Sequence, residues 1–476
     1  MAFEIPGVGD EVRQRRVTSE VLRGFIAEVI NLDIKIFVEG TVGNLLGISR
    51  GGFLSMIFFG FLLSLWTLIP DLPLFLTAWI VGTIPLWILP ASVAGAWKAW
   101  IWYIQSDFLS KRNPVLYEVK MPRDLVKSPR GMELALTHLW HDSGETTFFN
   151  RKWQGGLRPY WALEIASFGG EVHFYMWTWS DWKQTLQAAI YSQYPEVELV
   201  EVEDYASKYV FDPEKDAVFC TDYRYEPRND AYPIKTYVEF ELDKDPKEEY
   251  KVDPLSGIVE LLSNLKPTEQ TWLQIIFTQN KDYRRAPGGR PWELESRYSG
   301  LCKEEIDKIR KDLVGNPDSP TDKWKSYSRV QMYRINEIIR TIERNMGKHP
   351  FSVGLRGVYI APTEDFTLEG WKNVHFMWRP VGNPQYLNQL RPRRWHTPFD
   401  YPWQDLWDYR YNLHASRFFD CYRRRAHFYA PYIMPHNMMS SEVLATIWHP
   451  ISTGVAAPGV ERIPAKKAQP PPNLPK

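Results

Sequence analysis

The pattern of hydrophobic and polar residues divides the chain into a short apolar part and a much longer polar part. Residues 52–69 (GFLSMIFFGFLLSLWTLI) and residues 72–97 contain no charged side chain, and Pro70 and Asp71 lie between the two runs. A helix of about 20 apolar residues spans a hydrocarbon core of roughly 30 Å. The pattern therefore predicts a transmembrane helical hairpin over residues 51–104. The alternative is a pair of buried core helices in a large soluble domain.

The flanking charges predict an orientation for this hairpin. Basic residues precede the first run and follow the second, whereas the turn between them carries only Asp71. The excess of basic residues in cytoplasmic segments then places both termini in the cytoplasm and the protein in the cytoplasmic (inner) membrane as a multi-pass protein. Four aromatic residues fall where a membrane-interface belt is expected: Trp97, Trp100, Trp102 and Tyr103.

The segment before the hairpin, residues 1–50, is predicted to contain an amphipathic helix that starts at Glu20. Apolar residues recur there at helical spacing over positions 21–30. The sequence leaves two locations open for this helix. Its apolar face fits the inner membrane surface, and it fits equally the cytoplasmic body that follows the hairpin.

The residues after the hairpin alternate between strand and helix patterns. In a first subdomain, residues 105–210, two strands over 161–167 and 172–177 are joined by a turn at Gly169 and Gly170. A helix over 181–194 and a strand over 197–202 follow. A strand and a helix, over 117–120 and 131–139, precede them. This order predicts a split β-α-β, ferredoxin-like sandwich.

A second subdomain, residues 230–380, has a similar order of elements. It contains predicted strands over 234–242, 271–279 and 351–360 and predicted helices over 253–265, 328–346 and 366–378, with an insertion at 280–325. An aromatic and arginine-rich segment, residues 381–450, and a proline- and lysine-rich tail, residues 451–476, complete the chain. The predicted fold class is therefore α+β: a transmembrane hairpin followed by a cytoplasmic body of two split β-α-β sandwiches.

Composition adds two constraints. The 476 residues contain 57 Lys plus Arg and 57 Asp plus Glu, so no overall charge excess points to a nucleic-acid partner, although a local patch is not excluded. The three cysteines, Cys220, Cys302 and Cys421, are far apart and fit neither a disulfide framework nor a metal-ligand spacing. This usage agrees with a reducing compartment.

No motif predicts catalysis, a cofactor or a metal. The sequence has no G-x-x-x-x-G-K-[ST] loop to hold nucleotide phosphates. His138 and His141 have the spacing of a helical pair, but spacing fixes no third ligand. A thiol nucleophile at Cys421, with His414 or His427 as base, would need an oriented base and an oxyanion hole that cannot be read from the sequence. We therefore expect a protein that is not an enzyme and has no catalytic, cofactor or metal residues.

Basic and aromatic residues interleave after position 386, and these arginines are the candidate contacts for a partner. They are Arg391, Arg393, Arg394, Arg423, Arg424 and Arg425. Arginine beside aromatic rings is used to bind single-stranded nucleic acid, protein surfaces and anionic lipid headgroups. The sequence leaves these three partners open.

Several segments together carry a family resemblance. They include ALEIASFGGEVHFYMWT, QAAIYSQYPEVELVEVEDY, DPLSGIVELLSNLKPTEQTWLQIIF and SSEVLATIWHP followed by PPNLP. In combination these segments resemble an uncharacterised family of patescibacterial (candidate phyla radiation) membrane proteins. Residues 100–476 are also similar to the N-terminal region of type IV secretion and conjugation-type ATPases, in which a HerA-like motor follows the PPNLP segment. This chain lacks the nucleotide loop of that motor.

The resemblance implies a membrane-anchored, non-catalytic docking or scaffold protein. Such a protein would serve a type IV secretion-like or DNA-translocation system and work with a separately encoded HerA-like ATPase, with a homo-oligomer as a further expectation. Two alternatives come from other classes: a nucleic-acid-binding membrane protein, and an enzyme with an unrecognised site at the inner leaflet.

Overall fold

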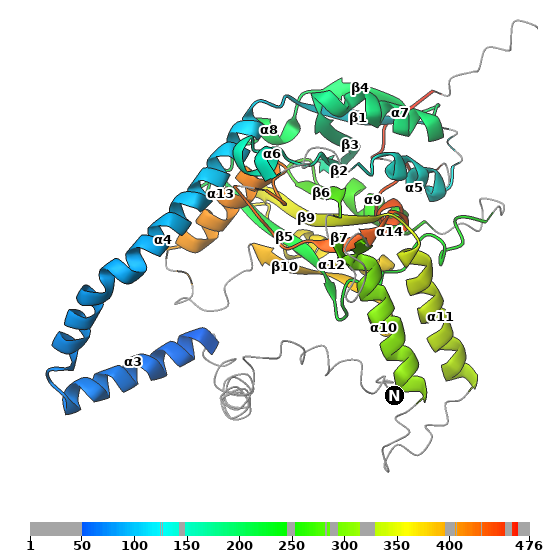
Figure 1. Cartoon of the computed structure of the whole chain (residues 1–476). Coiled ribbons are helices and arrows are strands. Elements are labelled where there is room, and N and C mark those ends of the chain that lie inside the picture. Colours follow the sequence, from blue (N-terminus) through cyan, green and yellow to red (C-terminus); the bar gives the residue numbers. More distant parts are fainter. Residues whose placement is uncertain are drawn as a thin grey trace, which may run out of the picture. The chain divides into compact units, whose positions relative to one another are not determined.

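A computed structural model describes residues 50–123, 125, 127–141, 148–244, 253–280, 283–285, 294–314, 329–395, 405, 407–429, 431–452 and 459–464. These residues form two compact units (Figure 1). One unit holds helix α3 (Arg50–Leu68), helix α4 (Leu72–Ser110) up to Tyr103, and residues 405 and 407–410. The other unit, called the body below, holds the remaining described residues. The predicted amphipathic helix at residues 20–30 lies outside the described residues.

The two apolar runs form helices, but not the predicted transmembrane spans. Within the described residues, no single helix has both the length and the apolar character to cross a membrane. In the described part of α3, the apolar segment is Met56–Leu68. Helix α4 bends by 59° between Leu74–Ile84 and Ile88–Ser110, so only these two arms together have the length and apolar character of a span. Pro85 lies between the two arms, and proline has no backbone N–H for a helix hydrogen bond. This finding contradicts the predicted transmembrane hairpin and the predicted multi-pass inner-membrane localisation.

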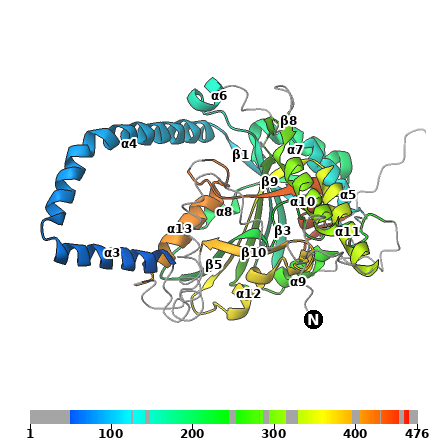
Figure 2. The ribbon, with the colours of Figure 1, turned by 60° about the horizontal axis from the view of Figure 1, so that its bottom comes forward.

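One large sheet replaces the two predicted sandwiches. Its strands are arranged in the order β10-β5-β9-β6-β2-β3-β1, with β4 and β12 both on β1 and β11 on β9 (Figure 2). All these pairs are antiparallel except β1 with β12. The strands are β1 (Pro114–Pro122), β2 (Tyr160–Phe168), β3 (Glu171–Trp179), β4 (Glu198–Val202), β5 (Asp216–Glu226), β6 (Gln270–Gln279), β9 (Pro350–Pro362), β10 (Gln389–Trp395), β11 (Asn437–Ser440) and β12 (Arg462–Ile463). A small separate ribbon pairs β7 (Tyr283–Arg285) with β8 (Leu294–Ser296).

The two predicted sandwiches form one sheet because residues 211–242, which lie between them, differ from their predicted structure. The predicted strand at 234–242 is a series of turns, in which Ile234 and Tyr237 are buried while Val238 and Phe240 are only partly buried. The strand that the sequence reading missed is β5, and it pairs with both β9 and β10. Because β6 also pairs with β2 along nine residue positions, strands from the two predicted subdomains form a continuous sheet.

Helices cover both faces of this sheet, and most of them were predicted. One face packs against α5 (Pro129–His138), α7 (Lys183–Gln193), α9 (Pro254–Ser263), α12 (Leu368–Phe376) and α14 (Ser441–Ile447). The other face packs against α8 (Tyr205–Lys208), α13 (Tyr409–Arg423) and the end of α4. Strand β6 shows the alternation that two buried faces require, since Leu273 and Ile275 join the first core and Trp272 and Ile276 the second.

Two further helices extend the body beside this sheet. Helices α10 (Arg297–Val314) and α11 (Arg329–Met346) lie side by side in Figure 1 and share a third core that includes Ile306 and Ile342. The remaining helices are short: α6 (Phe148–Trp153) and the 3-10 turns η2 (Ser180–Trp182) and η4 (Arg379–Val381).

Capping explains why several helices begin where the sequence predicts. Ser440 accepts a hydrogen bond from the Val443 N–H at the start of α14. Asp253 caps α9 in the same way through the Leu255 N–H, and Pro254 occupies the first helical turn.

The β2–β3 turn gives a stability test. Gly170 has a φ of +95°, and a Cβ there would lie 2.8 Å from the Ser263 carbonyl oxygen. We expect Gly170→Ala to destabilise the body by roughly 1–3 kcal/mol. The matched control is Gly257→Ala in α9, where a Cβ meets nothing within 4 Å. The control should stabilise the protein by up to about 1 kcal/mol, because alanine favours helix. Equal effects in chemical denaturation would contradict the account.

Candidate functional site

A row of polar residues crosses the middle of the sheet on the face that α13 covers. The cross-strand register places Tyr175 (β3) opposite Glu164 (β2), Glu164 opposite Gln274 (β6), Gln274 opposite Arg356 (β9), and Arg356 opposite Asp222 (β5). Directly opposite residues share a face and lie within contact distance. Four members of the row are at most 4% exposed: Glu164, Gln274, Arg356 and Asp222. Buried polar groups of this kind need partners.

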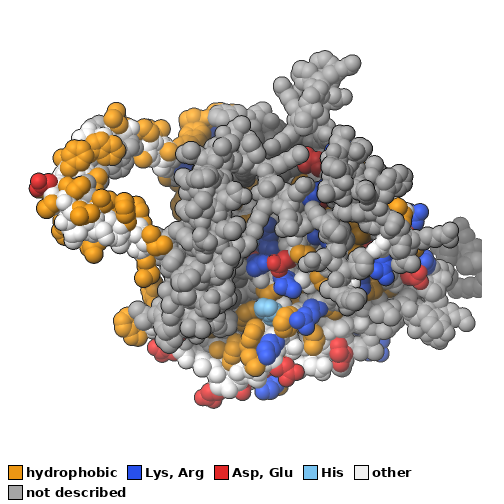
Figure 3. Space-filling model, turned by 90° about the horizontal axis from the view of Figure 1, so that it is seen from below, with side chains coloured by type: hydrophobic (Ala, Val, Ile, Leu, Met, Phe, Trp, Pro, Cys, Tyr) orange, Lys and Arg blue, Asp and Glu red, His pale blue; other side chains and the backbone are white. Residues whose placement is uncertain are grey.

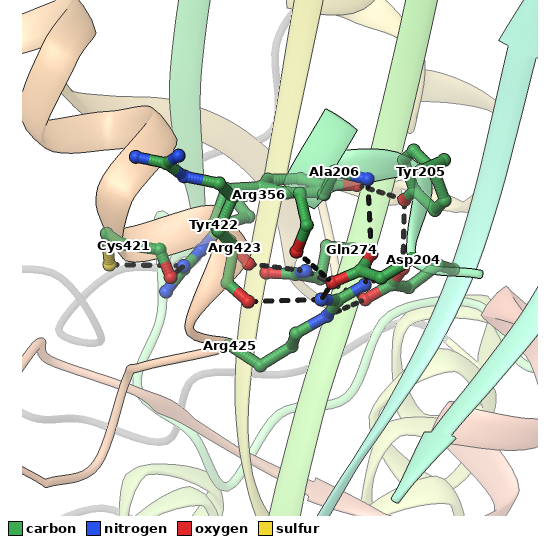
Figure 4. Close-up of polar contacts among 11 residues, drawn as sticks. Asp204, Tyr205, Ala206, Gln274, Arg356, Cys421, Tyr422, Arg423 and Arg425 are labelled. Carbon is green, nitrogen blue, oxygen red and sulfur yellow. Dashed lines mark hydrogen bonds and ion pairs between the residues drawn. The ribbon is translucent and has the colours of Figure 1, made fainter. Parts of the chain in front are cut away.

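Arg425, just after α13, supplies the central partner (Figure 4). Its Nε and Nη2 atoms donate to the two carboxylate oxygens of Glu164 at 3.0 and 3.1 Å, and Nη2 also donates to Asp204 at 2.8 Å. Its Nη1 donates to Asp204 and to the Arg423 carbonyl oxygen. All five guanidinium N–H groups therefore have acceptors, although the Arg425 side chain is only 1% exposed. We call Arg425, Glu164 and Asp204 the buried ion triad.

The backbone at Arg425 is held in an uncommon conformation. Helix α13 ends in a Schellman motif, in which the Ala426 N–H donates to the Cys421 carbonyl and the Arg425 N–H to the Tyr422 carbonyl. Arg425 takes the left-handed position of this motif with a φ of +48°, where glycine is usual. The left-handed conformation costs an L-residue roughly 1–2 kcal/mol. The ion pairs of the side chain offset this cost and fix the direction in which the chain leaves the helix.

Neighbouring side chains complete the hydrogen bonding of the triad. Glu164 also accepts from the Tyr205 hydroxyl and from Gln274 Nε2, each at 2.8 Å, and Tyr205 bonds the Tyr422 hydroxyl at 2.9 Å. Burial raises the pKa of Asp204, but the hydrogen bonds and charge of Arg425 outweigh burial and hold this pKa below its usual value. Asp204 is thus ionised at neutral pH, and Glu164 accepts hydrogen bonds at both carboxylate oxygens.

Arg356 forms a second buried centre next to the triad. Its Nη2 donates to the Ala426 carbonyl at 2.7 Å and lies 2.9 Å from His427 Nδ1, and its Nε lies 3.7 Å from Asp222. The His427 ring packs over Gly354, where a Cβ would lie 2.3 Å from the ring. Burial, followed by the charge of Arg356, lowers the pKa of His427 well below its usual value. His427 is therefore neutral: Nδ1 accepts from Arg356, and Nε2 donates to the Pro435 carbonyl at 3.2 Å.

The cysteines are buried and poorly suited to act as nucleophiles. All three are free thiols. Burial raises the pKa of Cys421 to about 11 and that of Cys302 to about 12, and it raises the pKa of Cys220 as well. A reactive cysteine needs a lowered pKa. The thiol of Cys421 lies 3.0 Å from the Ala426 carbonyl, to which it donates, and 3.1 Å from Arg356 Nη1.

The structure separates the six arginines that the sequence singled out. Arg391 and Arg393 are exposed on strand β10, and both contact Glu226. Arg394 lies in the same strand opposite Asp222. Arg423 and Arg424 face Asp420 at 4.0 and 2.9 Å on the surface of α13. Among residues 423–425 only Arg425 is buried, so this basic cluster is not one continuous surface.

Three of the aromatic residues near these arginines are core residues. Phe418, Phe419 and Tyr422 are at most 4% exposed and pack on the sheet around Trp272. Base stacking needs an exposed ring face. These three rings are therefore not available to a single-stranded nucleic acid.

The four aromatic residues predicted at a membrane interface lie along α4. Trp97, Trp100, Trp102 and Tyr103 are between 36% and 61% exposed. The interface role depended on the predicted spans, so it has no structural basis once those spans are absent.

The histidine pair predicted as a weak metal candidate does not gather further ligands. His138 contacts the Leu134 carbonyl at 2.9 Å, and the His141 ring packs against Trp182. In the part of the chain that the structure describes, no group of three or more His, Cys, Asp or Glu side chains has a metal-binding arrangement.

A shallow cavity of about 340 Å³ opens beside the end of α4. Aromatic side chains line it, including Phe108, Trp179 and Trp182. The guanidinium of Arg112 lies 4.5 Å from the Phe108 ring centre and pairs with Asp181. The cavity thus combines an apolar wall with a charge that is already neutralised, and it brings no acid-base pair together.

Comparisons with known proteins do not assign this chain to a family. No protein-family model and no curated protein matches the sequence.

The buried ion triad predicts a large and specific loss of stability on mutation. We expect Arg425→Met to lower the free energy of unfolding by about 3–5 kcal/mol, because it leaves the buried carboxylate of Glu164 and the partly buried carboxylate of Asp204 without their counter-charge. The neighbouring Arg424→Met should change it by less than about 0.5 kcal/mol, since Arg424 is exposed. Urea denaturation followed by tryptophan fluorescence measures both. Similar losses in the free energy of unfolding for the two variants would contradict the prediction that the triad stabilises the protein more than a surface ion pair does.

His427 predicts a pH dependence of stability. Its pKa in the folded protein is below the ordinary value of 6.5, so the unfolded chain binds the proton first as the pH falls. Stability should be unaffected above about pH 6.5 and should fall below it by up to about 1.4 kcal/mol per pH unit. His427→Asn should remove this part of the slope between pH 6.5 and 5. Identical slopes for variant and wild type would contradict a neutral, buried His427.

Proposed function

We propose that this chain is a non-catalytic docking protein that binds a separately encoded partner protein through the apolar surface of α3 and α4. The observation that carries the proposal is the exposure of large apolar side chains along both helices. Examples are Phe59, Trp66 and Trp79, which are 67%, 55% and 62% exposed. Soluble proteins rarely expose a contiguous apolar surface of this extent unless another molecule covers it.

The partner we propose is an ATPase of the HerA-like type. The resemblance of residues 100–476 to the region that precedes such a motor supports this choice. The occupant of α3 and α4 is therefore expected to present apolar and aromatic side chains, because these supply most of the energy at protein interfaces.

The polar interior supports the non-catalytic part of the proposal. Glu164 and Asp204 both pair with Arg425, whose five N–H groups all have acceptors, and Arg356 is held between Asp222 and His427. Catalytic acids and bases need a free proton position that a substrate reaches. These groups instead connect α13 and the following residues to the sheet.

The test is direct binding between the full-length chain and the HerA-like ATPase of the same genome. We expect the triple variant Phe59→Gln, Trp66→Gln and Trp79→Gln to bind the ATPase at least tenfold more weakly, because buried aromatic side chains are typical interface hot spots worth about 2 kcal/mol or more each. The measurement is biolayer interferometry in buffer without detergent, because detergent would cover the apolar surface of α3 and α4.

The matched control replaces exposed apolar residues of the body. Val210→Gln and Ile433→Gln, at positions that are 75% and 71% exposed, should leave ATPase binding unchanged. The proposal is wrong if wild type does not bind the ATPase, or if the triple variant binds it normally. It is also wrong if the chain binds phospholipid vesicles through α3 and α4 while ATPase binding does not depend on these helices.

A further inference from the structure

The two ends of the large sheet carry opposite charge. Strand β10 is the last strand at one end, and β4 lies at the other end, beyond β1. Residues 389–395, which form β10, contain three arginines and no acidic residue. Residues 196–208, which contain β4, hold five acidic residues and one lysine. We call these ends the basic edge and the acidic edge.

Exposure at both edges makes these charges available to another molecule. The side chains of Arg391 and Arg393 are 59% and 54% exposed, and they share one carboxylate, that of Glu226. Near the basic edge, Arg379 is also exposed and packs over the Phe376 ring at 3.6 Å. Figure 3 shows the body from below, where Lys and Arg side chains stand beside hydrophobic ones.

The acidic edge has the complementary character. Glu196, Glu198, Glu201 and Glu203 are all exposed. Lys183 lies 3.9 Å from Glu201, and Lys208 lies 2.7 Å from Glu203. These two lysines do not offset the acidic residues of the segment, so the edge keeps a negative excess.

We propose that copies of this chain associate head to tail, with the basic edge of one copy against the acidic edge of the next. Ion pairs between side chains carry this contact. Pro392 lacks a backbone N–H, and the register shift between Pro392 and Arg394 interrupts the edge, so a long main-chain ladder between copies is not expected. A heterologous contact of this kind closes into a ring or continues as a filament. Because charge drives it, salt weakens it.

Charge reversal on each edge tests the proposal with the full-length chain. Arg391→Glu with Arg393→Glu makes both edges acidic, and Glu198→Arg with Glu201→Arg makes both edges basic. Each double variant alone should self-associate at least tenfold more weakly than wild type in sedimentation equilibrium at 50 mM salt. An equimolar mixture of the two should recover association, since each edge then meets an opposite charge.

Controls separate this contact from net charge and from α3 and α4. All samples contain nonionic detergent, which covers the apolar helices, and no ATPase. Lys303→Glu with Lys311→Glu, and Glu304→Arg with Asp307→Arg, change the charge on α10 by the same amounts and should leave self-association intact. A monomeric wild type of 55.8 kDa at 50 mM salt and 0.1 mM protein would overturn the proposal. So would variants that associate like wild type, or a mixture that stays monomeric.

Discussion

The body depends on one buried ion pair more than on any other single contact, the pairing of Arg425 with Glu164. Glu164 lies in the middle of a central strand, and Arg425 follows a helix 261 residues later. Neither group is tolerable in this interior without the other, because an unpaired buried charge is far less stable than a paired one. The pair therefore requires α13 to cover this face of the sheet in one position. The left-handed backbone at Arg425 is a consequence of the same requirement.

The remaining polar groups of the row make the packing specific. An apolar face accepts a covering helix in several positions that differ little in energy, whereas Glu164, Gln274 and Arg356 accept partners only in fixed directions. Tyr205, Tyr422 and His427 supply those partners from two different segments. Both cores combine apolar packing with buried polar pairs: His449 lies 3.0 Å from Asp253 on the side of α9, and Arg425 pairs with Glu164 on the side of α13.

The interior and the surface of the protein therefore have different roles. The interior uses its ionisable groups for cohesion, and the surfaces keep the features that point to other molecules: the apolar helices α3 and α4, and the charged edges formed by β10 and β4. A docking role and a self-association role draw on separate surfaces. Each can therefore be removed by mutation while the other remains.

The sequence by itself determined the local elements. Most helices and strands of the body lie where periodicity, turn residues and capping residues predict them, because these signals act over a few neighbouring residues. A glutamate within WALEIAS and a glutamine within TWLQIIF also mark buried polar positions, and this signal was available in the sequence. Tertiary structure alone decided two things: that both halves share one sheet, and that Arg425 is buried while Arg423 and Arg424 are not. Each depends on contacts between segments far apart in the chain, or on the exact path of the backbone, which no local pattern of residues encodes.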